Sequence, residues 1–327
     1  MPYLNKKQAT QFLNDLVQGK LVEGKIIDQL TEMANRGETV EEITGMAQAM
    51  RALMVPVTTA YPVIDTCGTG GSGLNRINTS TLVAFILAAD DIYVAKHGNK
   101  AASGRCGSFD VLEKLGVNIE LKAEEIKSSL QKTHLGFIYA RLFHPAMKII
   151  NPIREKIGKR TIFNLLGPLL NPAKASKQLM GVNNLETAQK MIHVLRNLQL
   201  KRVLVVIGSD GLDEITLTGD TTIMELRNGE ITQTTITPES VGLSKVSRQQ
   251  IEGGSVELNA SIFRDILENR AKKPYLDLVL FNAGAGFYLA DKASSIAEGV
   301  NRARIILESG AAQQKFLDYR LFSQNLK

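Results

Sequence analysis

The N-terminal part of the chain carries apolar side chains at a helical spacing. In residues 12–17 and again in residues 26–33, the apolar positions fall on one face of a helix. Thr39 is followed three positions later by Glu42, a capping-box pattern that predicts the start of a third helix. We therefore expect a small helical domain over residues 1–62, with its apolar faces packed inside the molecule.

From residue 61 onward, short runs rich in β-branched and aromatic residues alternate with helix-like segments. The predicted strands are 61–64, 92–95, 135–139, 178–182 and 203–207, and the predicted helices between them are 81–89, 108–115, 123–133 and 185–198. Alternation of this kind indicates a mainly parallel sheet with helices on its faces. The expected fold class is therefore α/β, with a larger α/β domain over residues 63–327 beside the helical domain.

The chain after residue 220 begins with a hairpin pattern and continues in helices. Residues 221–226 and 231–237 are two strand-like runs joined across Asn228-Gly229, a dipeptide favoured in tight hairpin turns. The helices predicted after the hairpin are 247–252, 260–269, 274–290 and 293–307.

Two glycine-rich turns, in residues 65–81 and 96–110, each follow a predicted strand and lead into a predicted helix. This arrangement directs backbone N–H groups at an anion, and glycines let the main chain approach it closely. The residues that would serve such a site are Gly68, Gly70, Gly71, Asn78, Ser80, Thr81 and Lys96. One such turn is usually only a turn, but two in succession predict a site for a phosphorylated, strongly anionic ligand. The spacing matches neither a Walker A loop nor a dinucleotide-binding fingerprint.

Charge and composition narrow the class of ligand and the location. The formal charge is +6 and the pI about 9.2, which suits an anionic ligand and would also suit nucleic acid. Aromatic residues are only 6% and no compact Lys/Arg run occurs, which argues against a nucleic-acid platform without excluding one. No apolar run is long enough to cross a membrane, and the start of the sequence lacks the apolar core of a signal peptide. The two cysteines, Cys67 and Cys106, are expected as small buried thiols, with a bridge between them left open, and favour a reducing, cytoplasmic location.

Two polar clusters have both a functional and an ordinary structural interpretation. Arg154 and Arg160 open a stretch rich in Asn and Pro that runs to residue 173, and two solvated arginines with a loop would explain it equally well. Asp213 and Glu214 follow the predicted strand 203–207. Adjacent carboxylates after a strand are most often a solvated turn, yet they also suit Mg²⁺, which takes carboxylates together with substrate phosphates.

The histidines are ambiguous in the same way. His97 could be a core histidine, a general base or a wall of an aromatic site, and its neighbours Lys96 and Asn99 favour a functional place. His134 and His144 stand at predicted helix boundaries, and we assign them no role.

Together these motifs resemble the anthranilate phosphoribosyltransferase family. The resemblance rests on Gly68-Thr69-Gly70-Gly71, Asn78-x-Ser80-Thr81, Lys96-His97-Gly98-Asn99, Gly107-Ser108-x-Asp110 and the series from Arg160-Thr161 to Ala173. It implies a fold of the nucleoside phosphorylase/phosphoribosyltransferase type, with part of residues 142–175 joining the helical domain, and a homodimer. It also implies transfer of the 5-phosphoribosyl group from 5-phosphoribosyl-1-pyrophosphate to the amine of anthranilate in tryptophan biosynthesis, with Mg²⁺ as cofactor.

The resemblance assigns phosphate and metal roles to single residues. Lys96 and Ser108 take phosphate-binding positions of the family. Ser80 matches the first magnesium position, and Asp213 and Glu214 match the second.

The resemblance also assigns residues to the part of the site that binds the acceptor, anthranilate. Arg154 is expected to bind the anthranilate carboxylate, because a guanidinium matches a planar carboxylate with two parallel hydrogen bonds. His97 and Asn99 are expected to face anthranilate, and Gly98, Gly167 and Pro168 complete the substrate-binding set. No essential side-chain base is expected, because the nucleophile is an uncharged aromatic amine.

Three positions depart from the family pattern. Ser72 stands where the family usually has Asp, Arg76 where it usually has Thr or another small residue, and Lys100 where it usually has Arg. Ser72 and Arg76 make the loop more cationic than the family pattern. This could mean tighter pyrophosphate binding, altered use of magnesium, or that the chain is a paralogue of the family. The rival functions are a pyrimidine nucleoside phosphorylase, a non-catalytic nucleic-acid-binding relative, and a phosphoribosyltransferase for another aromatic acceptor.

Overall fold

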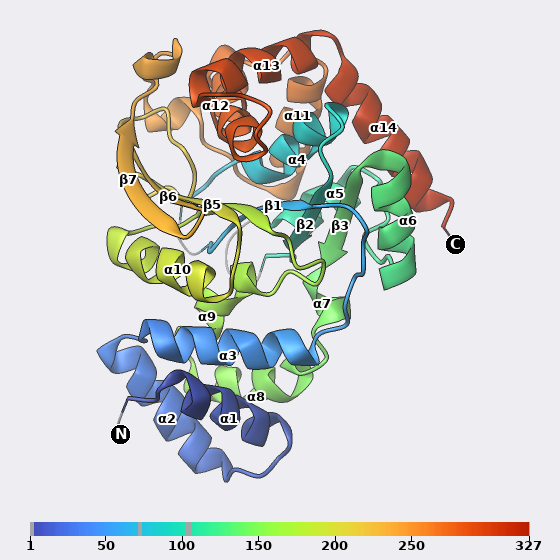
Figure 1. The fold of residues 1–327 in the computed structure, drawn as a ribbon. Coiled ribbons are helices and arrows are strands. Elements are labelled where there is room, and N and C mark those ends of the chain that lie inside the picture. The colour runs from blue at the N-terminus through green and yellow to red at the C-terminus, as the bar shows by residue number, and fades with distance from the viewer. Residues whose placement is uncertain (1–2, 71–73, 102–105, 327) are drawn as a thin grey trace.

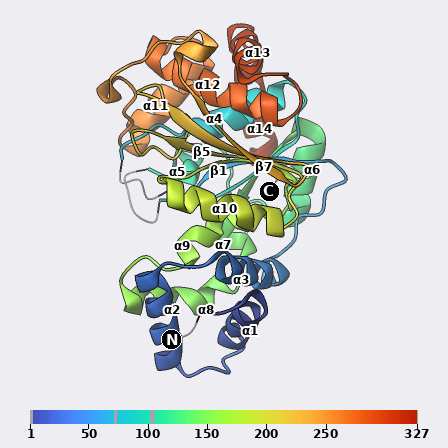
Figure 2. The same cartoon turned by 60° about the vertical axis from the view of Figure 1, so that its left-hand side comes forward.

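The structure, a computed structural model, describes residues 3–70, 74–101 and 106–326. Figures 1 and 2 show a body of helices at one end, a seven-stranded sheet in the middle and a second group of helices beyond the sheet. The helical body consists of α1 (Lys6–Val17), α2 (Glu23–Arg36), α3 (Val40–Leu53), α8 (Met147–Ile157) and α9 (Phe163–Leu166).

The capping box predicted at Thr39 is confirmed. The Glu42 N–H donates to Thr39 Oγ1 at 3.2 Å, and the Thr39 N–H donates to Glu42 Oε2 at 3.0 Å, which starts α3. The buried Glu42 carboxylate also accepts from the Leu4 N–H at 3.0 Å and pairs with Arg36 at the end of α2. One carboxylate therefore joins the starts of α1 and α3 to the end of α2.

The sheet has the order β3-β2-β1-β4-β5-β6-β7. The parallel strands are β1 (Ile64–Gly68), β2 (Val94–Gly98), β3 (Leu135–Tyr139), β4 (Lys177–Gly181) and β5 (Arg202–Gly208), and the antiparallel strands are β6 (Thr221–Arg227) and β7 (Glu230–Ile236). The mainly parallel sheet and the hairpin are thus as predicted. Asn228 and Gly229 both have positive φ (53° and 85°), as the tight turn between β6 and β7 requires.

Some predicted element bounds are wrong. The strands predicted at 61–64 and 92–95 begin later and run on into the expected loops, so that Gly68 and Gly98 end β1 and β2. Ladder pairing explains this, because Gly68 pairs with β4 and Gly98 with β3, and such pairing overrides the weak strand propensity of glycine. The predicted helix 247–252 is only a 3-10 turn, η3 (Arg248–Gln250).

Helices cover both faces of the sheet. On the face away from the helical body lie α4 (Thr79–Ala89), α5 (Ser108–Lys114), α11 (Val256–Leu267), α12 (Lys273–Leu289), α13 (Ile296–Glu308) and α14 (Ala311–Gln324), the last of which the sequence analysis missed. The other elements are α6 (Ala123–Thr133) and α7 (Ala140–Phe143) beside β3, α10 (Leu185–Asn197) on the opposite face, and the 3-10 turns η1 (Gly167–Leu169) and η2 (Glu239–Val241).

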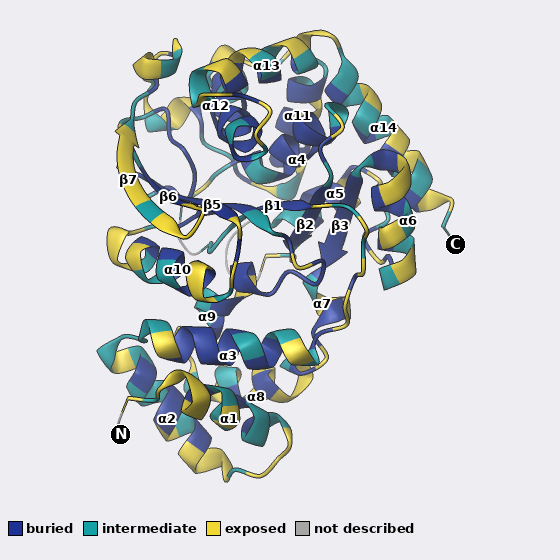
Figure 3. Cartoon of the chain, in the orientation of Figure 1, coloured by how far each residue is buried: buried dark blue, intermediate teal, exposed yellow. Residues whose placement is uncertain are grey.

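Side chains of β5 alternate between two large apolar clusters, one on each face. Leu204 and Val206 belong to the cluster under α4 and α12, while Val203 and Val205 belong to the cluster shared with α10 and the helical body. Figure 3 shows buried residues concentrated along the sheet and the helix faces that meet it. The helical body therefore shares a continuous apolar core with one face of the sheet. The predicted domain border at residue 62 stays a prediction.

Within the described residues, no helix combines the length and the hydrophobicity that crossing a bilayer demands.

Replacing Glu42 by Gln is expected to destabilise the fold at neutral pH by about 3 kcal/mol, the scale for breaking a buried ion pair. Burial alone would raise the pKa of Glu42, but hydrogen bonds from Arg36, Leu4 and Thr39 lower it below its ordinary value. A lowered carboxylate pKa means that the stabilisation is present above the unfolded-state pKa and is lost as pH falls through the folded-state value. Urea unfolding should therefore give a wild-type advantage that shrinks in acid. Glu41→Gln, an exposed carboxylate in the same helical turn, is the matched control and should change little; equal effects of the two variants would contradict the proposed role of Glu42.

Candidate active site

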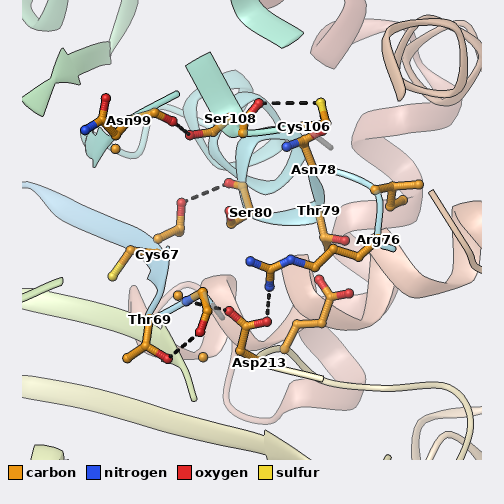
Figure 4. A pocket seen from close by; sticks show the side chains of 18 of the residues that line it. Cys67, Thr69, Arg76, Asn78, Thr79, Ser80, Asn99, Cys106, Ser108 and Asp213 are labelled. Carbon is orange, nitrogen blue, oxygen red and sulfur yellow. Dashed lines mark hydrogen bonds and ion pairs between the residues drawn. The ribbon is translucent and has the colours of Figure 1, made fainter. Parts of the chain in front are cut away.

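A cavity of about 870 Å³ opens at the carboxyl ends of β1, β2, β4 and β5. The helix after β1, α4, covers one face of the sheet, whereas α10, which follows β4, covers the other. Neighbouring strands whose connections leave on opposite faces create a crevice at their carboxyl ends, where ligands of open α/β sheets bind. Figure 4 shows side chains from several of these strand ends and loops pointing into the cavity.

The first glycine-rich turn contacts a carboxylate. A Cβ on Gly68 would lie 2.6 Å from Asp213 Oδ2, so a side chain at the end of β1 would have to displace this carboxylate. Gly70, with φ of 65°, donates its N–H to the same Asp213 oxygen at 3.0 Å. This N–H is therefore engaged with a carboxylate in the present arrangement. Gly71 and Ser72 lie outside the described residues.

The start of α4 brings Asn78, Thr79 and Ser80 to the cavity. Asn78 Oδ1 accepts from Asn259 Nδ2 on α11 at 3.0 Å, which fixes the helix start. Thr81, a predicted binding residue, is fully buried and does not line the cavity. The predicted helix start thus borders the cavity, but the neighbouring Thr79 rather than Thr81 lines it.

Lys96 lies in the middle of β2, with 2% of its surface exposed. Its ammonium group donates to the Thr66 carbonyl oxygen and, at 3.0 Å, to Ser80 Oγ. Burial lowers the pKa of Lys96 from its ordinary value, while the nearby Asp65 carboxylate opposes this. A cation is thus held between β1 and the start of α4, on the wall of the cavity.

His97 forms a buried pair with His144, a residue to which the sequence analysis gave no role. Their Nε2 atoms lie 3.0 Å apart, and both rings are more than nine-tenths buried. Burial, reinforced by the neighbouring His144, lowers the pKa of His97 to about 3, and burial lowers the pKa of His144 to about 4. Both rings are therefore neutral at neutral pH, with one Nε2–H donating to the other Nε2.

The second glycine-rich turn places Gly98, Asn99 and Ser108 on the cavity wall. A Cβ on Gly98 would lie 2.8 Å from Ser108 Oγ and 2.9 Å from the Phe109 ring, which requires glycine at the end of β2. Ser108 Oγ donates to the Asn99 carbonyl at 3.4 Å. Lys100 pairs with Glu113 at 2.8 Å.

Three predicted acceptor residues do not line this cavity. Arg154 lies on α8, partly exposed, with Nη1 3.4 Å from Asn151 Oδ1. Gly167 is exposed, and the carbonyl of the buried Pro168 accepts from Gln178 Nε2 at 2.6 Å. Arg160 and Asn164, from the same motif but outside the predicted set, do line the cavity.

A second, smaller cavity of about 300 Å³ continues from the first toward the helical body. Thr69, Arg160 and Asn164 border both spaces, and Glu38 and Lys190 border the smaller one. The two cavities together extend from the glycine-rich turns to the end of α2.

Asp213 and Glu214 line the main cavity but are not equally available to a metal ion. One oxygen of Asp213 is paired with Arg76 and the other accepts from Gly70, whereas Glu214 Oε1 is buried without a hydrogen-bond partner among the described residues. Burial raises the pKa of Glu214 to about 7, opposed by the Arg76 guanidinium. The described residues contain no group of three or more His, Cys, Asp or Glu suited to hold a metal, so any ion here needs oxygens from elsewhere. Asp213 in its present pairing does not fit a magnesium ligand, whereas Glu214 Oε1 does. Ser80 Oγ lines the same cavity and accepts from the Lys96 ammonium group, so it could meet an ion only through its remaining lone pair.

Cys67 and Cys106 are free thiols, each half-buried. Burial raises the pKa of Cys106 to about 11 and also raises that of Cys67 well above its ordinary value, so neither is a ready nucleophile.

The chain matches one family over most of its length. Residues 60–313 match the α/β domain of the glycosyl transferase family, and residues 2–54 match its helical bundle domain.

Relatives of known function cover nearly the whole chain. The anthranilate phosphoribosyltransferase of Dehalococcoides mccartyi is 44% identical over 325 residues, which are 99% of this chain and 95% of the relative. That of Herpetosiphon aurantiacus is 44% identical over 313 residues, covering 95% and 93%.

Solved structures agree. Anthranilate phosphoribosyltransferase from Thermus thermophilus superposes with a TM-score of 0.92 at 40% identity, covering 99% of this chain and 97% of the other. The enzyme from Saccharomyces cerevisiae, in complex with PRPP and Mg, gives 0.88 at 24% identity, covering 98% and 94%, and shows the shared fold alone.

The buried histidine pair gives a prediction that can be checked without any ligand. Between weakly acidic and weakly basic pH, ring chemical shifts of His97 and His144 in NMR spectra should stay constant, because both pKa values lie near 3–4. In urea the same rings should titrate near the ordinary value of about 6.5. Since the folded-state values are lowered, the pair favours folding above about pH 6.5 and costs stability as pH falls from there toward the folded values. Titration of either ring near neutrality in the folded protein would contradict the neutral pair.

Proposed function

The chain belongs to the anthranilate phosphoribosyltransferase family, and we propose that it transfers the 5-phosphoribosyl group of 5-phosphoribosyl-1-pyrophosphate to the amine of anthranilate. The products are N-(5-phosphoribosyl)anthranilate and pyrophosphate, a pentosyl transfer of tryptophan biosynthesis. The observation that carries the proposal is the cavity at the carboxyl ends of the parallel strands, which is lined by Lys96, Ser80 and Ser108. The chain is also related to enzymes of this name over 99% of its length.

The reaction forms a bond from the anthranilate nitrogen to ribose C1 as the bond from C1 to the pyrophosphate oxygen breaks, and the amine releases a proton. Positive charge develops at C1 and negative charge on the departing pyrophosphate. Stabilising the leaving group is therefore the main electrostatic task of the site.

Lys96 suits this task because its ammonium group is fixed by Thr66 and Ser80 and is shielded from water. A buried, preoriented cation stabilises developing negative charge more strongly than a solvated one. We assign Gly68, Gly70, Asn78, Gly98, Asn99 and Ser108 to the phosphoribosyl pyrophosphate part of the cavity, with Gly71 and Thr81 at the family positions beside them.

When bound, Mg²⁺ would supply further neutralisation of the charge on the pyrophosphate. Ser80 Oγ and the unpartnered Glu214 Oε1 are the oxygens that would meet it. Asp213, expected to share the second magnesium position, is held by Arg76.

The neutral His97 ring supports a mechanism without a protein base. A group with a pKa of about 3 is a poor proton acceptor near neutral pH. Its buried ring instead forms an uncharged wall of the cavity, suited to an aromatic acid. Arg154, Gly167 and Pro168 are proposed to complete the acceptor side, with movement of the helical body bringing α8 toward the cavity.

We also propose a homodimer and a cytoplasmic location. The first rests on family membership, and the second on a biosynthetic activity and two free cysteines.

Anthranilate fluorescence should decay when protein, Mg²⁺ and phosphoribosyl pyrophosphate are all present, and should persist when any one is omitted. No decay at saturating substrate would overturn the assignment of anthranilate. Other aromatic amines and salt-dependent DNA binding would then test the rival acceptor and the nucleic-acid-binding relative.

Arg154→Ala is expected to raise the KM for anthranilate on the order of 10- to 100-fold, the cost of losing a charged hydrogen-bond partner, with little change for phosphoribosyl pyrophosphate. Arg141→Ala on α7, which removes an exposed arginine of the same region, is the control. Arg160→Ala distinguishes the two arginines of the motif. If that variant, and not Arg154→Ala, loses affinity for anthranilate, the carboxylate-binding role belongs to Arg160.

A further inference from the structure

Arg76 stands in the cavity with its guanidinium directed at Asp213 (Figure 4). Arg76 Nη1 forms an ion pair with Asp213 Oδ1, and Asp213 Oδ2 accepts from the Gly70 N–H at 3.0 Å. The Asp213 side chain has no exposed surface, whereas that of Arg76 keeps 32% exposed. Both oxygens of the carboxylate are therefore engaged, while the Arg76 side chain lines the cavity and is still partly exposed.

The backbone of Arg76 is fixed by contacts with α11 and with the segment that leads into it. Its carbonyl oxygen accepts from Asn259 Nδ2 at 3.0 Å, and Asn259 Oδ1 accepts from the Gly254 N–H at 2.8 Å. A Cβ on Gly253 would lie only 2.2 Å from the Arg76 carbonyl oxygen, so this backbone packs closely against the start of α11. Contacts with neighbouring residues thus hold both partners of the ion pair, Arg76 through its carbonyl oxygen and Asp213 through the Gly70 N–H.

Glu214 supplies the second observation. It is 8% exposed and lines the same cavity, and its Oε1 has no hydrogen-bond partner among the described residues. Of the two adjacent acidic side chains, Asp213 is paired with the Arg76 guanidinium, and Glu214 has an oxygen without a hydrogen-bond partner among the described residues. Such a pair attracts a cation, and Arg76 already supplies one.

We propose that Arg76 is a built-in cation that occupies, at Asp213, the place of a second divalent ion. A guanidinium is always charged and carries five donors, so it can hold the carboxylate and still present N–H groups to a pyrophosphate oxygen. The chain then needs only the magnesium that arrives on its substrate. This inference rests on the proposed function for its substrate, but its metal arm needs no turnover.

The test is direct binding of Mn²⁺, a paramagnetic substitute for Mg²⁺, measured by electron paramagnetic resonance on the full chain without substrates. Wild type should bind no Mn²⁺ at this site, whereas Arg76→Thr and Arg76→Gln should each gain one bound ion per chain. Adding Asp213→Asn to either variant should remove the gained ion. Lys245→Thr, which deletes a surface cation paired with Asp220, should behave as wild type.

Two results would overturn the proposal. One is absence of the gained ion in both Arg76 variants when circular dichroism shows them folded. The other is an ion bound by wild type and lost in Asp213→Asn alone. Arg76→Gln keeps most of the side-chain length, so it guards against misfolding of the shorter variant.

Substrate affinity gives a second measurement. At a Mg²⁺ concentration that saturates wild type, Arg76→Thr should bind phosphoribosyl pyrophosphate more weakly, and additional Mg²⁺ should restore binding. If additional Mg²⁺ does not restore binding of phosphoribosyl pyrophosphate to Arg76→Thr, the proposal that Arg76 takes the place of a metal ion is overturned. If the metal results hold while anthranilate is not consumed, the acceptor assignment fails and the built-in cation stands.

Discussion

The burial of the Asp213 carboxylate is the constraint on which the site depends. It lies where the segment after β5 crosses the ends of β1 and β4, so close that a Cβ on Gly181 would come 1.7 Å from its carbonyl oxygen. A buried carboxylate is costly unless charge and hydrogen bonds compensate it. Gly70 and Arg76 supply that compensation, and in doing so they fix the glycine-rich turn against the sheet. The shape of the anion-binding cavity thus follows from satisfying one charge.

Local sequence signals predicted much of the fold. The capping box at Thr39 and the turn at Asn228-Gly229 specify their structures through neighbouring residues, and both are found. The ends of β1 and β2 were misplaced, because ladder partners elsewhere in the chain decide where a glycine-ended strand stops. α14 was missed although its buried Ala312, Phe316 and Tyr319 follow a helical period.

The candidate site divides in the same way. The residue types and spacing of the glycine-rich turns located the cavity, since each turn is contiguous in sequence. The contacts that set its charge are not contiguous: Arg76 and Asp213 are separated by 137 positions, and His97 and His144 by 47. No local pattern marks such pairs. The residues expected to bind anthranilate were assigned by resemblance alone. Variants of Arg154 and Arg160, two arginines of one motif, test this assignment.

The apolar core shared by the helical body and the sheet limits how the two can move. A wide hinge opening would separate Met46 and Met50 of α3 from the cluster that includes Met191 and Leu195 of α10 and would expose apolar surface to water. Small sliding displacements keep such an interface covered, which is the shear class of domain motion. Access to the cavity would then be regulated by ångström-scale shifts of packed helices, and side-chain volume along this seam becomes a determinant of turnover rate.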